Sequence, residues 1–246
     1  MEKSNIIALP PSPSVARGSM TDQVYRHLRD GLMAGRFAPG QRLTIRDLAE
    51  ALGSSPMPVR EALRRLQAEG AFEFSGTARL SVGQLCEAQL RDVRDARVAL
   101  EGLLAEHAAA RMTWVDDDEV RQLYGRLQAA ADAVDVTAYL WTNFAFHRRI
   151  YQIAQAPMIL GAVENFWLLI GPCFVLVAPD AAHLQRSMEA HRQILDALLD
   201  RDAPAARAAV TDDIMQAANC LSRVLDKAAK ERSVAAPRRR RGDIPE

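Results

Sequence analysis

Cysteine is scarce in this sequence of 246 residues. Its three cysteines, Cys86, Cys173 and Cys220, are scattered, and no two of them have a C-x-x-C spacing. This pattern excludes a disulfide scaffold and indicates a reducing, cytoplasmic compartment in which the cysteines act as small core residues. The N-terminus also lacks the charged-then-apolar pattern of a secretory signal.

Long uninterrupted apolar runs are absent as well. The most apolar stretch, residues 158–179, is broken by Glu164, Asn165 and a Gly-Pro pair. A membrane-spanning helix needs about 20 predominantly apolar residues. We therefore interpret this stretch as a buried helix and expect no membrane partner.

A net charge is lacking too, since 31 Lys and Arg balance 31 Asp and Glu. Residues 1–80 carry eleven basic and eight acidic side chains, whereas residues 81–230 carry fifteen and twenty. A basic front and an acidic middle indicate a nucleic-acid-binding module joined to a second unit. We expect a flexible arm over 1–19, a DNA-binding domain over 20–83, a helical domain over 84–230 and a disordered basic tail over 231–246. The four tail arginines fit either a solvated tail or a contact with DNA phosphates.

The elements expected in the N-terminal domain follow a characteristic order. Apolar residues spaced by four predict a helix over about 21–34, and Thr44 with an acid three residues later predicts the start of a second helix that ends near Gly53. A third helix begins after Ser55, and two β-prone runs around residues 75–77 predict a hairpin. This is the order of a winged helix-turn-helix.

The third helix is basic on one side. Ser55 is its expected N-cap, with its hydroxyl bonded to the N–H of Met57, and prolines are tolerated in a first turn whose N–H groups lack helical partners. Apolar residues at helical spacing should pack inward: Val59, Ala62, Leu63 and Leu66. Arg60 and Arg64 share another face, with Arg65 beside them. That face is either a solvated surface or, as the order of elements favours, a reader of the major groove.

Residues 24–70 resemble the DNA-binding domain of the GntR family of bacterial transcription regulators, and Pro-Val-Arg-Glu-Ala-Leu at 58–63 is the most distinctive part. The resemblance implies DNA contacts by Arg46 and Arg60 and a wing tip at Gly76. The family usually has arginine and threonine where this chain has Pro56 and Met57. We therefore expect an altered operator preference or a lower affinity.

The rest of the chain is predicted to be almost entirely helical. Short loops separate six segments, at about 84–112, 116–134, 136–155, 157–178, 180–201 and 203–229. Short connections imply antiparallel neighbours and therefore a bundle. The expected fold class is mainly α: an N-terminal winged helix-turn-helix plus a C-terminal antiparallel six-helix bundle.

Polar side chains interrupt the apolar stripes of three of these helices. Asn143 and His147 lie four residues apart, and His191 and Asp213 occupy the stripes of the last two helices. A buried polar group needs a bonding partner. These side chains are therefore either hydrogen-bonded core groups or ligands of a divalent metal such as zinc, nickel or manganese.

Arg97 lies on an apolar stripe of the first bundle helix and should also point inward. A buried guanidinium needs an anion. That anion is either an internal acid, Glu101 or Asp213, or the carboxylate of an effector held between Arg97 and the metal.

The helical region resembles the FCD ligand-binding domain of the FadR subfamily, in the short form of the VanR-type group. Members often carry an Asp-x-x-x-His pair, a later His, and another His 22 residues further on. This chain has Asn143 and His147, then His191, then Asp213 at that spacing, so the carboxylate has moved. The resemblance implies a metal site and a small organic acid as effector, which Arg97 would contact.

These features predict a homodimeric, ligand-responsive transcription regulator, usually a repressor in this family, that binds a near-palindromic operator. Two alternatives are a metal-dependent enzyme in the bundle and a non-catalytic interaction bundle. The sequence lacks the metalloenzyme motifs H-E-x-x-H and paired E-x-x-H. An enzymatic function of the bundle would also not explain the N-terminal DNA-binding domain. We therefore expect no enzymatic activity.

Overall fold

The computed structural model describes residues 18–75, 79–177 and 181–235. Its N-terminal part contains α1 (Met20–Met33), β1 (Arg42–Leu43), α2 (Ile45–Ala51), α3 (Pro56–Ala68), β2 (Phe72–Ser75) and β3 (Arg79–Val82). Strand β3 lies between β1 and β2 and pairs antiparallel with both. This is the predicted winged helix-turn-helix, with one strand, β1, that the sequence pattern did not indicate.

The core of this domain comes from the inner faces of α1 and α3. Leu28 of α1 and Leu63 and Leu66 of α3 have no exposed surface. Gly53 takes the left-handed backbone conformation, with φ 57°, and thereby ends α2 as predicted. Gly76, the predicted wing tip, lies outside the described residues.

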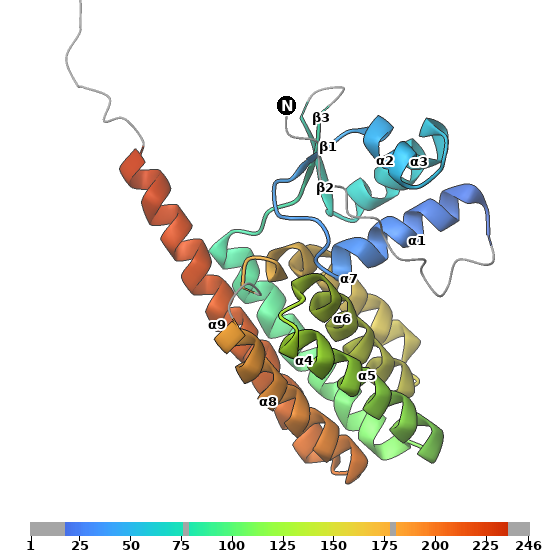
Figure 1. Cartoon of the computed structure of the whole chain (residues 1–246), viewed down its shortest axis with the longest axis vertical. Helices are drawn as coiled ribbons and strands as arrows, with labels where there is room; N and C mark the ends of the chain where they lie inside the picture. Colours follow the sequence, from blue (N-terminus) through green and yellow to red (C-terminus); the bar gives the residue numbers. More distant parts are fainter. Residues whose placement is uncertain (1–17, 76–78, 178–180, 236–246) are drawn as a thin grey trace, which may run out of the picture.

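The C-terminal part is an antiparallel bundle. Its helices are α4 (Glu87–Arg111), α5 (Trp114–Asp132), α6 (Val136–Ile153), α7 (Pro157–Phe174), α8 (Ala181–Leu199) and α9 (Ala203–Ala235). α4 packs along α9, α5 packs against α6 and α8, and α8 packs against α9. Figure 1 shows the end of α9 extending beyond its neighbours. The fold class predicted from the sequence is confirmed.

α7 is the described helix with the strongest apolar character. By length and composition alone it could cross a membrane, with a mean hydropathy of 1.4 over an 18-residue window. In the structure it packs against α1, α4 and α6, and 44% of that window is buried. Its inner side chains, such as Trp167 and Leu168, belong to the core of the bundle, as expected for the buried helix that the sequence predicted.

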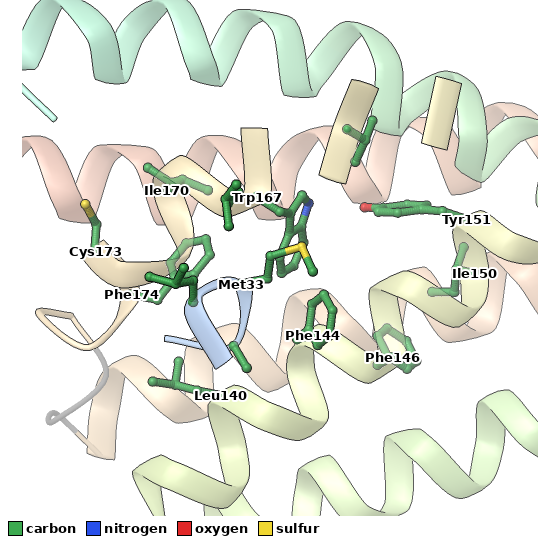
Figure 2. Packing of buried hydrophobic residues seen from close by; sticks show 14 of the residues in the cluster. Met33, Leu140, Phe144, Phe146, Ile150, Tyr151, Trp167, Ile170, Cys173 and Phe174 are labelled. Carbon is green, nitrogen blue, oxygen red and sulfur yellow. The ribbon is translucent and has the colours of Figure 1, made fainter. Parts of the chain in front are cut away.

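α1 joins the two domains. Its C-terminal end lies against α7 at Gly171, where a Cβ atom would meet the carbonyl oxygen of Leu32 and lie 2.7 Å from that of Met33. Met33 is fully buried, and Figure 2 shows its side chain in the hydrophobic cluster with Phe144 and Trp167. The N-terminal domain is thus anchored on α6 and α7.

Candidate functional site

α3 has one buried and one exposed face. Its buried face consists of Val59, Ala62, Leu63 and Leu66, which have no exposed surface. Met57, Arg60 and Arg64 lie on the other side and are exposed. Arg46 of α2 is exposed as well, so the helix-turn-helix presents basic side chains to the solvent.

Arg65, which the sequence placed beside the face of Arg60 and Arg64, is held by α1. It pairs with Asp22 at 2.9 Å, and its guanidinium carbon lies 3.9 Å from the centre of the Tyr25 ring. These contacts give Arg65 a role in joining α3 to α1. Arg64 is 3.7 Å from Glu61 at the exposed surface, where such a pair contributes little to stability.

Arg46 and Arg60 differ from these two arginines. Neither has a hydrogen bond or an ion pair among the residues that the structure describes, so both guanidinium groups are open to a ligand. Ser55 occupies the predicted N-cap position of α3, but its side chain makes no capping hydrogen bond. A cap usually bonds the N–H of the second or third helical residue, and the third one here is Pro58, which has none. The predicted bond to the Met57 N–H is not formed.

A cavity of about 40 Å³ lies among α4, α6, α7, α8 and α9. Its lining includes the candidate metal ligands and the candidate effector-binding residue predicted from the sequence: Arg97, Asn143, His147, His191 and Asp213. A space of this size holds about three water-sized groups. It can therefore accommodate an ion together with a few ligand atoms.

The polar atoms of this lining converge. His147 Nε2 is 3.1 Å from His191 Nε2 and 3.5 Å from Asp213 Oδ2, and His191 Nε2 is 2.6 Å from Asn143 Oδ1. Ligand atoms of the two histidines and Asp213 all lie within 4.8 Å of one another. Ligands about 2.0–2.2 Å from a common metal ion lie at comparable separations from one another.

Neighbouring groups determine which nitrogen of His147 carries the proton. Tyr151 donates its hydroxyl proton to Glu101 Oε2 at 2.6 Å and so cannot donate it to His147 Nδ1, 3.2 Å away. Nδ1 must therefore donate to the Tyr151 oxygen, which leaves a lone pair on Nε2 facing the cavity. Burial, with His191 and Arg97 nearby, holds the pKa of His147 well below its ordinary value, so the ring is neutral at pH 7.

His191 is oriented by its own helix. Its Nδ1 lies 2.6 Å from the carbonyl oxygen of Ser187, one turn earlier, and donates a hydrogen bond to it. His191 Nε2 then faces Asn143 Oδ1 and His147 Nε2. With Asp213, four potential ligand atoms surround one small space.

Arg97 and Glu101 form a buried ion pair one turn apart on α4. Arg97 Nε is 2.5 Å from Glu101 Oε1, and Nη2 is 3.2 Å from Oε2. Glu101 is fully buried and also accepts a hydrogen bond from the indole N–H of Trp167 at 3.0 Å. Of the two internal acids considered from the sequence, Glu101 is thus the direct partner of Arg97. Arg97 also lines the cavity.

Tyr151 and Ser187 were not predicted as members of this site. Tyr151 follows His147 by four residues, and Ser187 precedes His191 by four. Residues four apart are neighbours on a helix surface. The i, i+4 spacing is therefore the sequence signal that could have identified both.

Sequence comparisons match both domains. A model of the gntR family of bacterial regulatory proteins matches residues 20–76, and a model of the FCD domain matches residues 92–216. The HTH-type transcriptional regulator McbR of Escherichia coli (strain K12) is 29% identical over 210 residues, which cover 85% of this chain and 95% of McbR. The HTH-type transcriptional repressor RspR of the same strain is 23% identical over 197 residues, which cover 80% of this chain and 86% of RspR.

The solved structure of E. coli McbR/YncC has a similar fold. It matches with a TM-score of 0.78 at 29% identity, over 84% of this chain and 99% of that chain. Both families and these relatives are transcription regulators, not enzymes. The chain therefore belongs to the GntR family of bacterial transcription regulators and carries an FCD domain in its helical part.

Proposed function

We propose that the FCD domain holds a divalent metal ion on Asn143, His147, His191 and Asp213, and that a small organic acid bound beside the ion controls operator binding. The observation that carries this proposal is the convergence of two imidazole nitrogens, an amide oxygen and a carboxylate oxygen on one small buried space, with separations of 2.6, 3.1 and 3.5 Å. When both histidine rings are neutral with the proton on Nδ1, the Nε2 lone pairs and the two oxygens face one another, and a cation among them replaces their repulsion by attraction.

The donor set suits a borderline transition metal. Two imidazole nitrogens, one carboxylate oxygen and one amide oxygen are ligands that zinc, nickel and manganese accept. The hydrogen bonds of His147 to Tyr151 and of His191 to the Ser187 carbonyl resemble those that commonly orient metal-binding histidines. Space within the cavity remains for water or for an oxygen atom of an effector.

A carboxylate effector fits between the metal ion and Arg97. The two hydrogen bonds to Glu101 use Nε and Nη2 of Arg97, which leaves Nη1 for another acceptor. Because Glu101 already neutralises Arg97, the metal ion supplies the main attraction for an anion, and Arg97 supplies direction. The effector site therefore depends on the metal site.

At the other end of the molecule, α3 reads the major groove of DNA. Arg46 and Arg60, with open guanidinium groups, contact bases or phosphates, and the uncapped hydroxyl of Ser55 is free to bond a phosphate. One such domain reads only a few base pairs, so a homodimer on a near-palindromic operator in the cytoplasm is the proposed functional form. Repression is the proposed outcome, as the name of RspR states for that relative.

The metal site can be tested by thermal unfolding. The protein is purified without a His-tag, stripped with a chelator, and melted with zinc, nickel or manganese. At least one metal should raise the melting temperature of the wild type and of His107→Ala, a control outside the cavity lining, but not that of His191→Ala. If none of the three metals changed the melting temperature of the wild type, the proposed metal site would be refuted.

Regulation can be tested by gel shift with the DNA upstream of the protein's own gene. The metal-loaded protein should retard this DNA at low salt, and a small organic acid should change the affinity. An acid that acts equally on metal-stripped protein would contradict an effector site built on the metal. A protein that retards no DNA would contradict the whole proposal.

A further inference from the structure

Met57 is an exposed apolar side chain on α3 that does not contribute to the core of the fold. It is the second residue of α3, and 74% of its surface is accessible. The other large exposed apolar side chains among the described residues lie outside α3: Met20, Trp114, Val115, Val134, Met158 and Leu176. Met57 is thus the one such side chain on the proposed recognition helix.

Its position on α3 aligns it with the basic face. Met57, Arg60 and Arg64 follow one another at spacings of three and four residues, so they project from the same side of the helix. The side chains of Val59, Ala62 and Leu63 project from the opposite, buried side. Any surface that Arg60 meets is therefore within reach of Met57, one turn nearer the N-terminus.

The first turn of α3 is poorly suited to bind phosphate through its backbone. Pro56 and Pro58 occupy the first and third helical positions and have no N–H. Only the N–H of Met57 remains among these three positions, although such groups usually make a helix N-terminus an anion site. The tip of the helix is therefore apolar in character.

We propose that Met57 recognises the methyl group of a thymine in each operator half-site. This inference rests on the proposed reading of the major groove by α3. In that groove the thymine C5-methyl is the one apolar feature that distinguishes a base, and apolar side chains contact it. The contact removes both the methyl group and the exposed methionine from water.

The geometry also limits where this thymine lies. Met57 and Arg60 are three residues apart, which corresponds to about 4.5 Å along a helix axis. Successive base pairs are about 3.4 Å apart. The thymine should therefore lie one or two base pairs from the base that Arg60 contacts.

Replacing thymine by deoxyuridine tests this proposal because it removes only the methyl group. A half-site is first selected from a random-sequence duplex pool with wild-type protein, and each thymine is then replaced in turn. Replacing the contacted thymine in a single half-site should weaken wild-type binding about fourfold, which corresponds to about 0.8 kcal/mol for one buried methyl group. Met57→Ala should bind both duplexes with equal affinity, whereas Met57→Leu should keep part of the preference.

Met158→Ala is the matched control, because Met158 is 87% exposed but lies on α7 of the bundle. It should show the wild-type preference for thymine. Bound DNA with no sensitive thymine, or a Met57→Ala variant that keeps the wild-type preference, would overturn the assignment of Met57 while leaving DNA binding intact. Failure of the wild type to select any DNA would overturn the proposed function itself, and the inference with it.

Discussion

Tyr151 connects the ion pair at the centre of the bundle to a histidine of the cavity. Its hydroxyl donates to Glu101 and accepts from His147, and only 1% of its surface is exposed. By keeping the His147 proton on Nδ1, it keeps the Nε2 lone pair available to a metal ion. The carboxylate, the phenol and the imidazole are hydrogen-bonded in series, so a change outside the proposed ligand set would reach the proposed metal site.

Replacing Tyr151 by Phe should therefore lower metal affinity by about 10–100-fold, since groups that orient metal ligands have effects of that size. The ring that fills the core remains, so the fold should persist. Competition with a chelator of known affinity measures the change. Tyr124→Phe removes a hydroxyl that is 3.4 Å from Gln128 and outside the network, and it should bind metal like the wild type. Wild-type affinity in Tyr151→Phe would show that the hydroxyl does not orient His147.

Arg97 should contribute to stability as well as to the proposed effector site. Arg97→Leu leaves the buried Glu101 carboxylate without its counter-ion, and we expect a loss of about 3–5 kcal/mol in the free energy of unfolding. Urea denaturation measures this loss. A double replacement of Arg97 and Glu101 by Leu should be less harmful than the single one, because it leaves no unpaired charge.

The matched control for this pair is Arg192→Leu. Arg192 and Asp196 have the same i, i+4 spacing on α8, but both are more than half exposed. An exposed pair of this kind contributes little to stability, so Arg192→Leu should unfold close to the wild type. If Arg97→Leu and Arg192→Leu lost equal amounts of unfolding free energy, burial would not be the reason why the Arg97–Glu101 pair matters for stability.

At the level of elements, the contact between α1 and α7 depends on a missing side chain. Gly171 lies in α7 against the last turn of α1, where a Cβ atom would be 2.8 Å from the Cα of Met33. This distance is too short for a methyl group, and the nearest atoms are backbone atoms of α1, which cannot rotate away as a side chain can. The close approach lets the Met33 side chain enter the bundle core (Figure 2).

Gly171→Ala should therefore force α1 away from α7 and lower the melting temperature, despite the better helix propensity of alanine. Gly161→Ala in the same helix is the control, because nothing lies within 4 Å of its added Cβ. That variant should gain about 0.5–1 kcal/mol in stability. Thermal unfolding of both proteins compares the two effects. A stabilised Gly171→Ala would show that α1 can move without loss.

The helices could be predicted because each depends on local information. Apolar spacing marked the inner face of α3, and Gly53 marked the end of α2. β1 was missed because it has only two residues, and it exists through pairing with β3, nearly forty positions later. Such a strand is determined by tertiary contacts, which a sequence window does not contain.

In the candidate site, too, local patterns could be predicted from the sequence and tertiary contacts could not. Asn143, His147, His191 and Asp213 could be identified as a group because polar residues on apolar stripes must meet partners in a core. The partners of Arg65 could not be predicted in this way, since Asp22 and Tyr25 lie on another helix, about forty residues earlier. Spacing within one helix shows which residues share a face but not what the neighbouring helix presents.

In the whole molecule, a polar link runs from the N-terminal domain to the cavity. Glu164 of α7 accepts from Arg29 of α1 at 2.8 Å and from Arg148 of α6 at 3.1 Å. Arg148 follows His147 directly in the chain, and Glu164 lies one turn before Trp167, which lines the cavity. A shift of α6 or α7 on binding of the proposed ligand would therefore be passed to α1, on which α3 packs (Figure 1).

Glu164→Gln should weaken this coupling more than it weakens either binding event. The variant keeps the shape of the side chain but removes the charge that both arginines share, with the Glu164 side chain only 17% exposed. Metal affinity and operator affinity of the metal-free protein should stay close to wild type. The change in operator affinity on adding metal should shrink by about 0.5–2 kcal/mol, the usual effect of a residue that carries coupling.

The control for this experiment is Glu106→Gln, which breaks the exposed pair of Glu106 with Arg207 between α4 and α9. That pair lies within the bundle and does not touch α1, so the metal-dependent change should be preserved. Operator titrations of the three proteins with and without metal give the coupling free energies directly. If Glu164→Gln responded to metal as the wild type does, the coupling would have to pass through the apolar contact of Met33 and Gly171, and Gly171→Ala would then be the variant that loses it.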